Sequence, residues 1–359
     1  MRYYIGGEAR LRRAVEDTAM SVFDGWAYEE VITPSVDYYS LFEQGMGHAE
    51  AHRAFRFTDT DGQLLALRPD VTSSVARAAA TLLAERTRPL RLCYAAPVFR
   101  QQQQSHAEWR RESTQLGCEL IGAAGAAADL EVLAIAAEIL ARLSLHEKYR
   151  ITINSVEIFN GIAAGLGLDG DSRERMRALI DTRDARELER FLGSYAISEE
   201  ERTVFAQLTQ LTGKGEILGR ARQVITNQRS VAALDDLEAL WQVVERMGLS
   251  DSFDIDLGDV SELDYYTGLI FKVFIEGTGS RVGRGGRYDR LIGNFGTNEP
   301  AIGFILDLDA LTDVLARSGG PLAGATTNDA VAIGAGELSA TFLQVRQLRA
   351  EGKRVKLEL

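Results

Sequence analysis

A long helical stretch, spanning about residues 160–245, lies between two strand-rich parts of the chain and limits the fold more than any other feature. Its apolar residues recur at helical spacing among many charged ones, and strand-like runs are few. Strand-like segments flank it, at Leu90–Phe99, Gln115–Ile121 and Ile151–Ile153 before it and at Phe253–Leu257, Leu269–Ile275 and 277–286 after it. The stretch is therefore interpreted as a helical insertion within one α+β domain whose sheet is mainly antiparallel.

The rest of this domain supplies further helices and one hairpin. The hairpin is predicted at 55–58 and 64–68, because Asp59-Thr60-Asp61-Gly62 between them is a strong turn signal. The other predicted elements are helices at Glu8–Val22, Asp70–Glu85, Asp129–Ser144 and Asp307–Ala316 and a strand at Trp26–Val31.

The C-terminal part is predicted to be a small appendage. Residues 319–328 contain Gly and Pro and are interpreted as a linker between the main domain, residues 1–318, and residues 329–359. The last segment has the pattern of a β-α-β unit, and at about 30 residues it is too short to fold independently. We expect it to be the remnant of a larger C-terminal domain.

Composition narrows the range of functions. Lys and Arg total 40 against 52 Asp and Glu, and the resulting net charge of −12 argues against bulk electrostatic binding of nucleic acid. No apolar run approaches the roughly 18 residues that cross a bilayer, and the N-terminus lacks the apolar stretch of a signal peptide. The only cysteines, Cys93 and Cys118, are expected to be buried packing residues, in keeping with a cytoplasmic location. Neither a nucleic-acid nor a membrane partner is expected.

Metal and cofactor motifs are weak. His48 and His52 are four residues apart, but no third ligand is evident and their order is not that of a zinc protease, so no metal site is predicted. The run Gly277–Gly283 lacks the third glycine of a dinucleotide fingerprint and the Lys-Ser/Thr pair of a phosphate-binding loop. No cofactor is predicted.

Polar residues at strand-like or helix-opening positions are more informative. Asp70 and Thr72 lie at the start of a predicted helix, where an N-cap role is the structural alternative. Gln115 and Glu119 would share one side of a strand, with Gly117 leaving room between them. Tyr265 and Tyr266 follow Asp264, and packing alone is the alternative for these rings. Acidic residues and tyrosines around one cleft suit a small ligand with an ammonium or imidazole group.

Together these segments resemble the core of the class II aminoacyl-tRNA synthetases, specifically the histidyl-tRNA synthetase type. Pro34 corresponds to the motif 1 proline at the dimer interface, and Leu67-Arg68-Pro69-Asp70-Val71-Thr72 is similar to the element that holds the amino acid's ammonium group. The other matching segments are Pro97–Arg100 with Gln115–Glu119 for motif 2, Leu263–Gly268 for the histidine-specific segment, and Gly285–Asp289 with Ala301–Phe304 leading into motif 3. The match covers roughly residues 8–316.

The resemblance implies a synthetase-like antiparallel sheet flanked by helices, a dimer formed through the Pro34 region, and a pocket for histidine. Asp70 and Thr72 would hold the ammonium group of histidine. Glu119, Tyr265 and Tyr266 would surround its imidazole. Arg100 and Gln115 are expected nearby.

Three departures from the synthetase pattern affect the handling of ATP. Ser261-Glu262 replaces the catalytic Arg-Gly pair, and neither residue supplies the cation that stabilises charge during adenylate formation. Gln102 replaces the motif 2 carboxylate. Motif 3 ends in Asp307-Leu308-Asp309-Ala310 in place of Gly-Leu-Glu-Arg, and Asp307 and Asp309 would repel a triphosphate. The chain is also too short to hold a complete anticodon-binding domain, which agrees with the loss of tRNA handling.

This pattern resembles the family of ATP phosphoribosyltransferase regulatory subunits, which are synthetase paralogues. The resemblance implies a non-catalytic subunit with no catalytic residues of its own. Its partner would be the short form of the catalytic subunit, which it would activate and place under feedback inhibition by histidine, the allosteric ligand, in the first step of histidine biosynthesis. Two alternatives stay open: a class II synthetase-like enzyme that still activates or transfers an amino acid, and a stand-alone amino-acid sensor.

Overall fold

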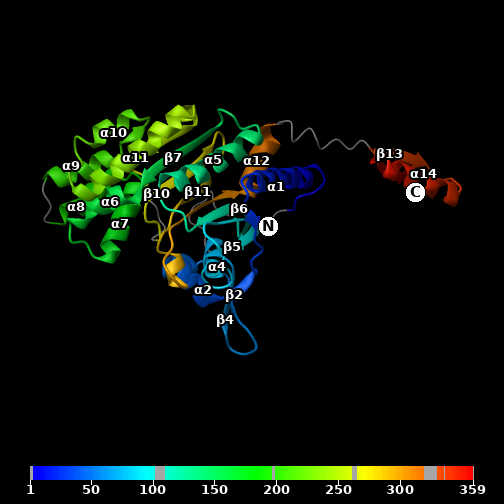
Figure 1. Ribbon diagram of the computed structural model, residues 1–359, viewed down its shortest axis with the longest axis horizontal. Helices are drawn as coiled ribbons and strands as arrows, with labels where there is room; N and C mark the ends of the chain where they lie inside the picture. Colours follow the sequence, from blue (N-terminus) through cyan, green and yellow to red (C-terminus); the bar gives the residue numbers. More distant parts are fainter. Residues whose placement is uncertain are drawn as a thin grey trace.

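One large sheet organises the chain (Figure 1). The computed structural model describes residues 3–101, 110–195, 199–260, 265–318, 330–334 and 336–358. The strand order is β1–β5–β6–β12–β11–β10–β7–β9–β8, and the described pairs are antiparallel except β1–β5 and β7–β9. The strands are β1 (Glu29–Glu30), β5 (Leu90–Phe99), β6 (Glu112–Ile121), β7 (Tyr149–Ser155), β8 (Thr212–Gly213), β9 (Phe253–Asp256), β10 (Leu269–Ile275), β11 (Arg281–Arg287) and β12 (Ala301–Asp307). The predicted α+β class with a mainly antiparallel sheet is confirmed.

The sheet is buried on both faces, as the strand alternation shows. On β5, Cys93 faces one hydrophobic core, whereas its neighbours Leu92 and Tyr94 face another. The first core lies under three helices, α1 (Gly7–Gly25), α5 (Ala126–Arg142) and α12 (Leu308–Ser318). The second is covered by α4 (Thr72–Ala80) and a short 3₁₀ turn, η3 (Ile292–Asn294). The predicted site residues on β6 face the α4 side.

The predicted helical stretch forms a group of helices at one end of the sheet, beside β7 (Figure 1). They are α6 (Val156–Ala164), α7 (Gly170–Asp181), α8 (Ala185–Gly193), α9 (Glu199–Leu208), α10 (Glu216–Ala221) and α11 (Gln228–Arg246), followed by the short turn η2 (Ser250–Ser252). Their apolar side chains join the same core that lies under α1. Within it, Phe159 on α6 meets Phe205 on α9 edge-on, with ring centroids 6.4 Å apart. The prediction missed β8, which is two residues long and adds to the edge of the main sheet.

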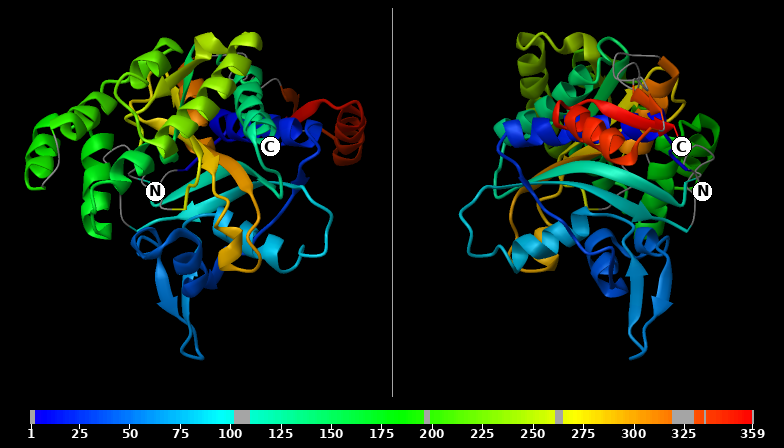
Figure 2. Two further views of the ribbon diagram at one scale, coloured as in Figure 1. Left: turned by 60° about the vertical axis from the view of Figure 1, so that its left-hand side comes forward. Right: turned by 90° about the vertical axis from the view of Figure 1, so that its right-hand side faces the viewer.

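A second, three-stranded sheet carries the predicted hairpin. It consists of β2 (Val36–Tyr38), β3 (Arg56–Thr58) and β4 (Leu64–Leu67), with α2 (Tyr39–Met46) and α3 (His48–Ala51) between β2 and β3. The β3–β4 pairing confirms the hairpin. Figure 2 shows it projecting from the body on the side away from α1.

Two predicted elements are shorter than expected. The strand predicted at Trp26–Val31 is reduced to β1, because Ala27 has a positive φ of 60° and forms a turn after α1. The helix predicted at Asp70–Glu85 ends at Ala80. Arg88 donates hydrogen bonds to the carbonyls of Leu83 and Arg86, at 2.9 and 2.8 Å, and so stabilises a non-helical turn there.

The C-terminal segment forms a parallel two-stranded unit, with β13 (Ala330–Gly334), α14 (Leu338–Ala350) and β14 (Arg354–Glu358). The β-α-β pattern predicted for it is present, whereas the predicted linker, 319–328, lies outside the described residues. Within the described ranges, no helix combines the length and apolarity needed to span a membrane.

Candidate functional site

Glu119 is the centre of a buried polar cluster on the α4 side of the sheet. Its side chain is 1% exposed and accepts hydrogen bonds from Thr72 Oγ1 at 2.8 Å and Tyr94 OH at 3.0 Å. Its other oxygen accepts a hydrogen bond from Tyr288 OH. Burial raises the pKa of Glu119 to about 7 despite these three donors. A carboxylate held this way can accept a further hydrogen bond from a ligand, or share a proton with it near neutral pH.

Glycines on the neighbouring backbone make the space for this carboxylate. Gly303 on β12 lies opposite Glu119 in the strand register, and a Cβ there would overlap Glu119 Oε2. Gly117 was expected to leave room between Gln115 and Glu119, and that space is taken by Tyr94: a Cβ at Gly117 would lie 2.6 Å from its phenol ring. Gly117 therefore contributes indirectly, because it leaves space for the Tyr94 hydroxyl that donates to Glu119.

Asp70 and Thr72 reach the cluster from the start of α4. Asp70 Oδ1 accepts a hydrogen bond from Ser73 N at 3.2 Å, as a capping side chain does, although the N-cap residue of α4 is Val71. Thr72 does not cap the helix and points its hydroxyl at Glu119. Both side chains are buried and line the same pocket.

Tyr265 and Tyr266 close the pocket from the segment before β10. Their ring centroids lie 4.8 Å apart, and Tyr265 meets Tyr288 edge-on at 6.0 Å. Burial raises the pKa of both phenols, that of Tyr266 to about 12, so they are hydrogen-bonding neutral groups at physiological pH. We call this site the tyrosine pocket, and its lining residues are Asp70, Thr72, Glu119, Tyr265, Tyr266, Arg284, Tyr288, Gly303, Phe304 and Ile305.

The side chains of the tyrosine pocket leave a space of only about 10 Å³, close to that of a single water molecule. An amino acid is larger, so we expect lining side chains to move when one enters. Arg284 has the longest side chain of the lining, with the most rotatable bonds. It also lines the neighbouring cavity.

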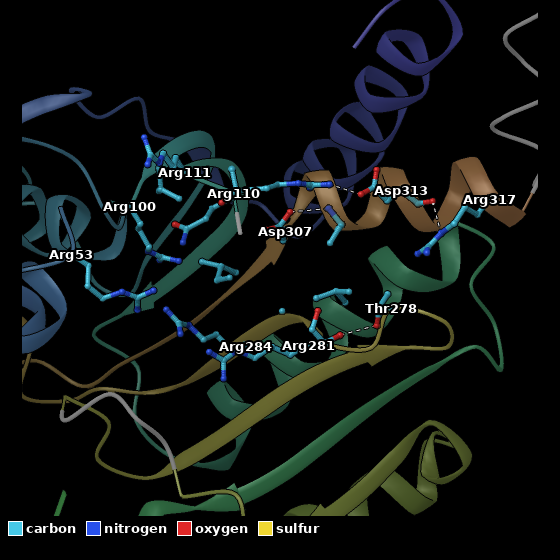
Figure 3. Close-up of a pocket in the computed structure, with 18 residues that line it drawn as sticks. Arg53, Arg100, Arg110, Arg111, Thr278, Arg281, Arg284, Asp307, Asp313 and Arg317 are labelled. Carbon is cyan, nitrogen blue, oxygen red and sulfur yellow. Dashed lines mark hydrogen bonds and ion pairs between the residues drawn. The ribbon is translucent and has the colours of Figure 1, made fainter. Parts of the chain in front are cut away.

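The neighbouring cavity is larger, about 320 Å³, and we call it the arginine cavity (Figure 3). Seven arginines line it: Arg53, Arg100, Arg110, Arg111, Arg281, Arg284 and Arg317. Two carboxylates, Asp307 and Asp313, share the lining. Figure 3 shows these side chains around one space, to which the segment before β3, the segments after β5 and before β6, β11, the end of β12 and α12 contribute.

The predicted site residues thus divide between two adjoining spaces. Asp70, Thr72, Glu119, Tyr265 and Tyr266 lie together in the tyrosine pocket. Arg100 and Gln115 line the arginine cavity instead, where Gln115 is 3% exposed.

Five residues that line the tyrosine pocket were not among the predicted site residues, and they are Arg284, Tyr288, Gly303, Phe304 and Ile305. Tyr288 and Gly303 lie in segments that were matched only as leading into motif 3, and Arg284 lies in the run 277–286, which was predicted only as a strand. Tyr288 directly follows β11, which pairs with β12, and β12 in turn pairs with β6 through Gly303 and Glu119. The approach of Tyr288 to Glu119 therefore depends on strand pairing, for which the sequence holds no local signal.

The positions where the sequence departs from the synthetases are partly described. Asp307 lies in the arginine cavity, where burial raises the pKa of its carboxyl to about 6. Asp309 does not line this cavity and instead accepts hydrogen bonds from Thr114 N at 2.8 Å and Tyr4 OH at 2.5 Å. Gln102, Ser261 and Glu262 lie outside the described residues.

No metal site is indicated by the described ranges, where no three His, Cys, Asp or Glu side chains are grouped for coordination. His48 and His52, the one pair considered from the sequence, have ring centroids 6.2 Å apart, and His48 Nδ1 lies 2.8 Å from Glu43 Oε1. Cys93 and Cys118 are buried and free, as predicted.

Comparison with known proteins identifies relatives of this chain. The family described as histidyl-tRNA synthetase matches residues 3–311. A protein of Moorella thermoacetica, named ATP phosphoribosyltransferase regulatory subunit, is 36% identical over 98% of this chain and 89% of its own length.

Two solved structures are similar over the whole chain. One, from Bacillus halodurans and described as an ATP phosphoribosyltransferase regulatory subunit/histidyl-tRNA synthetase, has a TM-score of 0.86 and 26% identity, and 91% of it is covered. The other, histidyl-tRNA synthetase from Nostoc, has a TM-score of 0.79 and 21% identity, with 84% covered, and so supports the fold alone.

Proposed function

The chain belongs to the family of ATP phosphoribosyltransferase regulatory subunits, which has a histidyl-tRNA synthetase-like fold, and from this premise we propose that it is a non-catalytic subunit that binds histidine in the tyrosine pocket. In this proposal it assembles with a short-form catalytic subunit, which is inactive without it. Histidine bound to the tyrosine pocket then inhibits the complex.

The observation that carries the histidine assignment is the environment of Glu119. A buried carboxylate with a pKa of about 7 matches an imidazole, whose own pKa is about 6.5, because a proton can be shared between the two at neutral pH. Tyr265 and Tyr266 supply aromatic faces, and Asp70 supplies the negative charge that an ammonium group needs. One pocket thus offers partners for both ends of histidine.

The small volume of the tyrosine pocket supports a regulatory role. Since about 10 Å³ does not accommodate an amino acid, a histidine-bound form differs from this one in the position of lining side chains. A ligand regulates only when it binds two conformations with different affinity, and here the two forms differ at the ligand site itself. The change would then be transmitted to the catalytic partner.

Reconstitution tests this function directly. A short-form catalytic subunit alone is expected to be nearly inactive, to gain activity when this chain is added, and to lose it again as histidine is titrated. Tyr265→Ala is expected to raise the histidine concentration needed for half inhibition at least tenfold, about 1.4 kcal/mol, while the activated complex still forms. Unchanged inhibition with this variant would place histidine elsewhere, for example at a subunit interface.

Two other functions remain distinguishable by simple assays. A synthetase-like enzyme would exchange pyrophosphate into ATP in the presence of histidine, and clear exchange would contradict the regulatory function. A stand-alone amino-acid sensor would bind histidine but fail to activate any short-form catalytic subunit. The presence of Asp307 in the arginine cavity, at the end of the motif 3 strand, favours the non-catalytic alternative.

Self-association through the Pro34 region is a further part of the proposal. Apolar side chains are exposed on β2, on the β3–β4 hairpin and in the loop before β2. They are Ile32, at 89% exposure, with Val36, Tyr38, Phe57 and Leu64. Scattered apolar residues are normal on a surface, but several on adjoining elements favour burial against another chain. A second copy, related by a twofold axis, is the proposed occupant.

Ile32→Lys tests the dimer. Since Ile32 is almost fully exposed in the single chain, the substitution is expected to leave folding unchanged and to weaken dimerisation at least tenfold, because a charge would be buried at the interface. Sedimentation across a concentration series measures this. Met247→Lys, at a 48% exposed position after α11, is the matched control and is expected to leave the dimer intact. Equal dimerisation of both variants would contradict this interface.

A further inference from the structure

We propose that a cavity on the helical side of the main sheet binds a small molecule that carries an ammonium group on an apolar body. The cavity measures about 490 Å³, and we call it the α11 cavity. It lies between α11 and the starts of α5, α6 and β10, and the end of β11 completes its lining. This site is independent of the proposed function.

The α11 cavity is separate from the tyrosine pocket, and the two share no lining residue. Leu237 and Leu269 of the α11 cavity belong to the core under α1 and α5, whereas Tyr265 of the tyrosine pocket packs on the core under α4. At the end of β11, Arg287 lines the α11 cavity and the next residue, Tyr288, lines the tyrosine pocket. A ligand in the α11 cavity would therefore occupy a second site.

Carboxylates outnumber guanidinium groups around the α11 cavity. Glu157 is balanced by Arg229, whose guanidinium donates to its two oxygens at 2.6 and 2.9 Å. Arg287 alone serves two carboxylates, those of Asp129 at 2.5 Å and Asp289 at 3.1 Å. Both carboxylates bind this guanidinium through Oδ1, and within the described part of the chain their Oδ2 atoms accept no hydrogen bond.

Asp236 on α11 adds a carboxylate that no guanidinium balances. It is exposed and lines the cavity, and among the described residues it has no hydrogen bond or ion pair. Burial raises the pKa of Asp129, and the charges of Asp289 and Asp236 raise it further, even against the effect of its guanidinium partner. Arg290, which is exposed near the cavity but outside its lining, reduces the excess of negative charge without removing it. The excess favours a cation in this cavity.

Ser155 gives a second and independent reason to expect a ligand. It is 9% exposed and lines the cavity, and its hydroxyl group forms no hydrogen bond with any described residue. Strand alternation places its side chain on the same face of β7 as Ile151 and Ile153, which point to the helical side. The hydroxyl does not cap α6, although Ser155 is the N-cap residue of that helix. An ammonium group could donate to this oxygen and so satisfy a buried polar group.

The rest of the lining is largely apolar, which suits the body of such a ligand. Leucines from α11 and β10 form one wall, and alanines on α11 leave the space beside it open. These residues are Leu237, Leu240, Leu269, Ala232, Ala233 and Ala239. Cavities of a few hundred Å³ that combine an apolar wall with a few polar groups are typical of small-molecule sites. An aliphatic amine offers partners to both parts of this lining.

Calorimetric titration of the whole chain with hexylamine tests the site. Hexylamine is positively charged at neutral pH, whereas 1-hexanol has the same aliphatic chain without the charge. Saturable binding of hexylamine is expected, with 1-hexanol binding about tenfold more weakly and hexanoate more weakly still. Absence of saturable hexylamine binding, or equal affinity for the alcohol or the carboxylate, would overturn the proposal.

Two adjacent aspartates on α11 provide a matched pair of variants. Asp236→Asn removes a charge that lines the cavity and is expected to weaken hexylamine binding about fivefold. Asp235→Asn removes an exposed charge that pairs with Arg222 outside the lining, and it should bind hexylamine as the wild type does. Equal affinity of the two variants would contradict the α11 cavity as the binding site.

Two further variants test the hydroxyl group and the separation of the two sites. Ser155→Ala is expected to weaken hexylamine binding about tenfold at an unchanged free energy of unfolding, because the hydroxyl has no partner to lose. Lower stability with unchanged affinity would instead show a structural role and refute the assignment. Glu119→Gln, which alters the tyrosine pocket, should bind hexylamine as the wild type does. Loss of binding in this variant would place the amine in the tyrosine pocket and overturn the second site, while the proposed function would stand.

Discussion

Replacing Glu119 with alanine is expected to lower the affinity for histidine about 100-fold or more and to abolish inhibition in the reconstituted complex. The substitution removes the buried carboxylate at the centre of the tyrosine pocket and leaves the hydroxyl groups of Thr72, Tyr94 and Tyr288 without their shared acceptor. A buried donor without a partner costs about 1–3 kcal/mol, and each 1.4 kcal/mol is a factor of ten in binding. Calorimetric titration with histidine measures the loss.

Two variants separate this effect from a general loss of structure. Glu131→Ala also removes a carboxylate, one that pairs with Arg91 at 2.8 Å away from the tyrosine pocket, and it should bind histidine normally. Glu119→Gln keeps the shape of the side chain but not its charge. If Glu119→Ala and Glu131→Ala bound histidine equally well, the assignment of the tyrosine pocket as the histidine site would be contradicted.

The glutamine variant also reports on the charge of Glu119 through stability. Burial raises the pKa of Glu119 from an ordinary value of 4.5 to about 7, so between these values the folded state holds a proton that the unfolded chain has lost. The contribution of Glu119 to the free energy of unfolding therefore falls as pH rises from 4.5 to 7, by about 3 kcal/mol in all, and is constant above. Urea unfolding should show the wild type losing stability relative to Glu119→Gln across this interval.

Much of the fold could be predicted because its strands are unambiguous. Leu90–Phe99 and Leu269–Ile275 were predicted with the bounds that β5 and β10 have, since both are rich in residues that favour strands and end at clear breaks. β8 could not be predicted, because two residues carry no periodicity and the pairing with β9 depends on the tertiary fold. The early end of α4 likewise depends on Arg88, which lies eight residues beyond Ala80 in the sequence.

Site residues could be predicted where they lie together on one strand or in one sequence motif. Gln115 and Glu119 do share a face of β6, as alternation requires. Their separation into two spaces was not predictable, because it depends on Arg284, which reaches between them from β11. The orientation of Arg281 was not predictable either. A β-bulge reverses the side of the sheet to which a strand residue points, and it leaves no periodic signal in the sequence.

Gly303→Ala is expected to reduce stability by about 3 kcal/mol and to abolish histidine binding, although it adds a single methyl group. Gly303 lies in the middle of β12, paired with Glu119 on one side and Gly286 on the other. An added Cβ would overlap both the Glu119 carboxylate and the carbonyl oxygen of Cys118, and the latter belongs to the backbone and cannot rotate away. Overpacking of a rigid core costs about 1–3 kcal/mol or more.

The matched control for this substitution is expected to change the stability in the opposite direction. Gly219→Ala lies in α10, where an added Cβ meets nothing within 4 Å, so a gain of up to about 1 kcal/mol is expected from helix propensity. Urea unfolding and histidine titration of both variants measure the contrast. Wild-type stability and histidine affinity in Gly303→Ala would mean that β12 has room for a Cβ beside Glu119. That result would contradict the close contact between Gly303 and the Glu119 carboxylate.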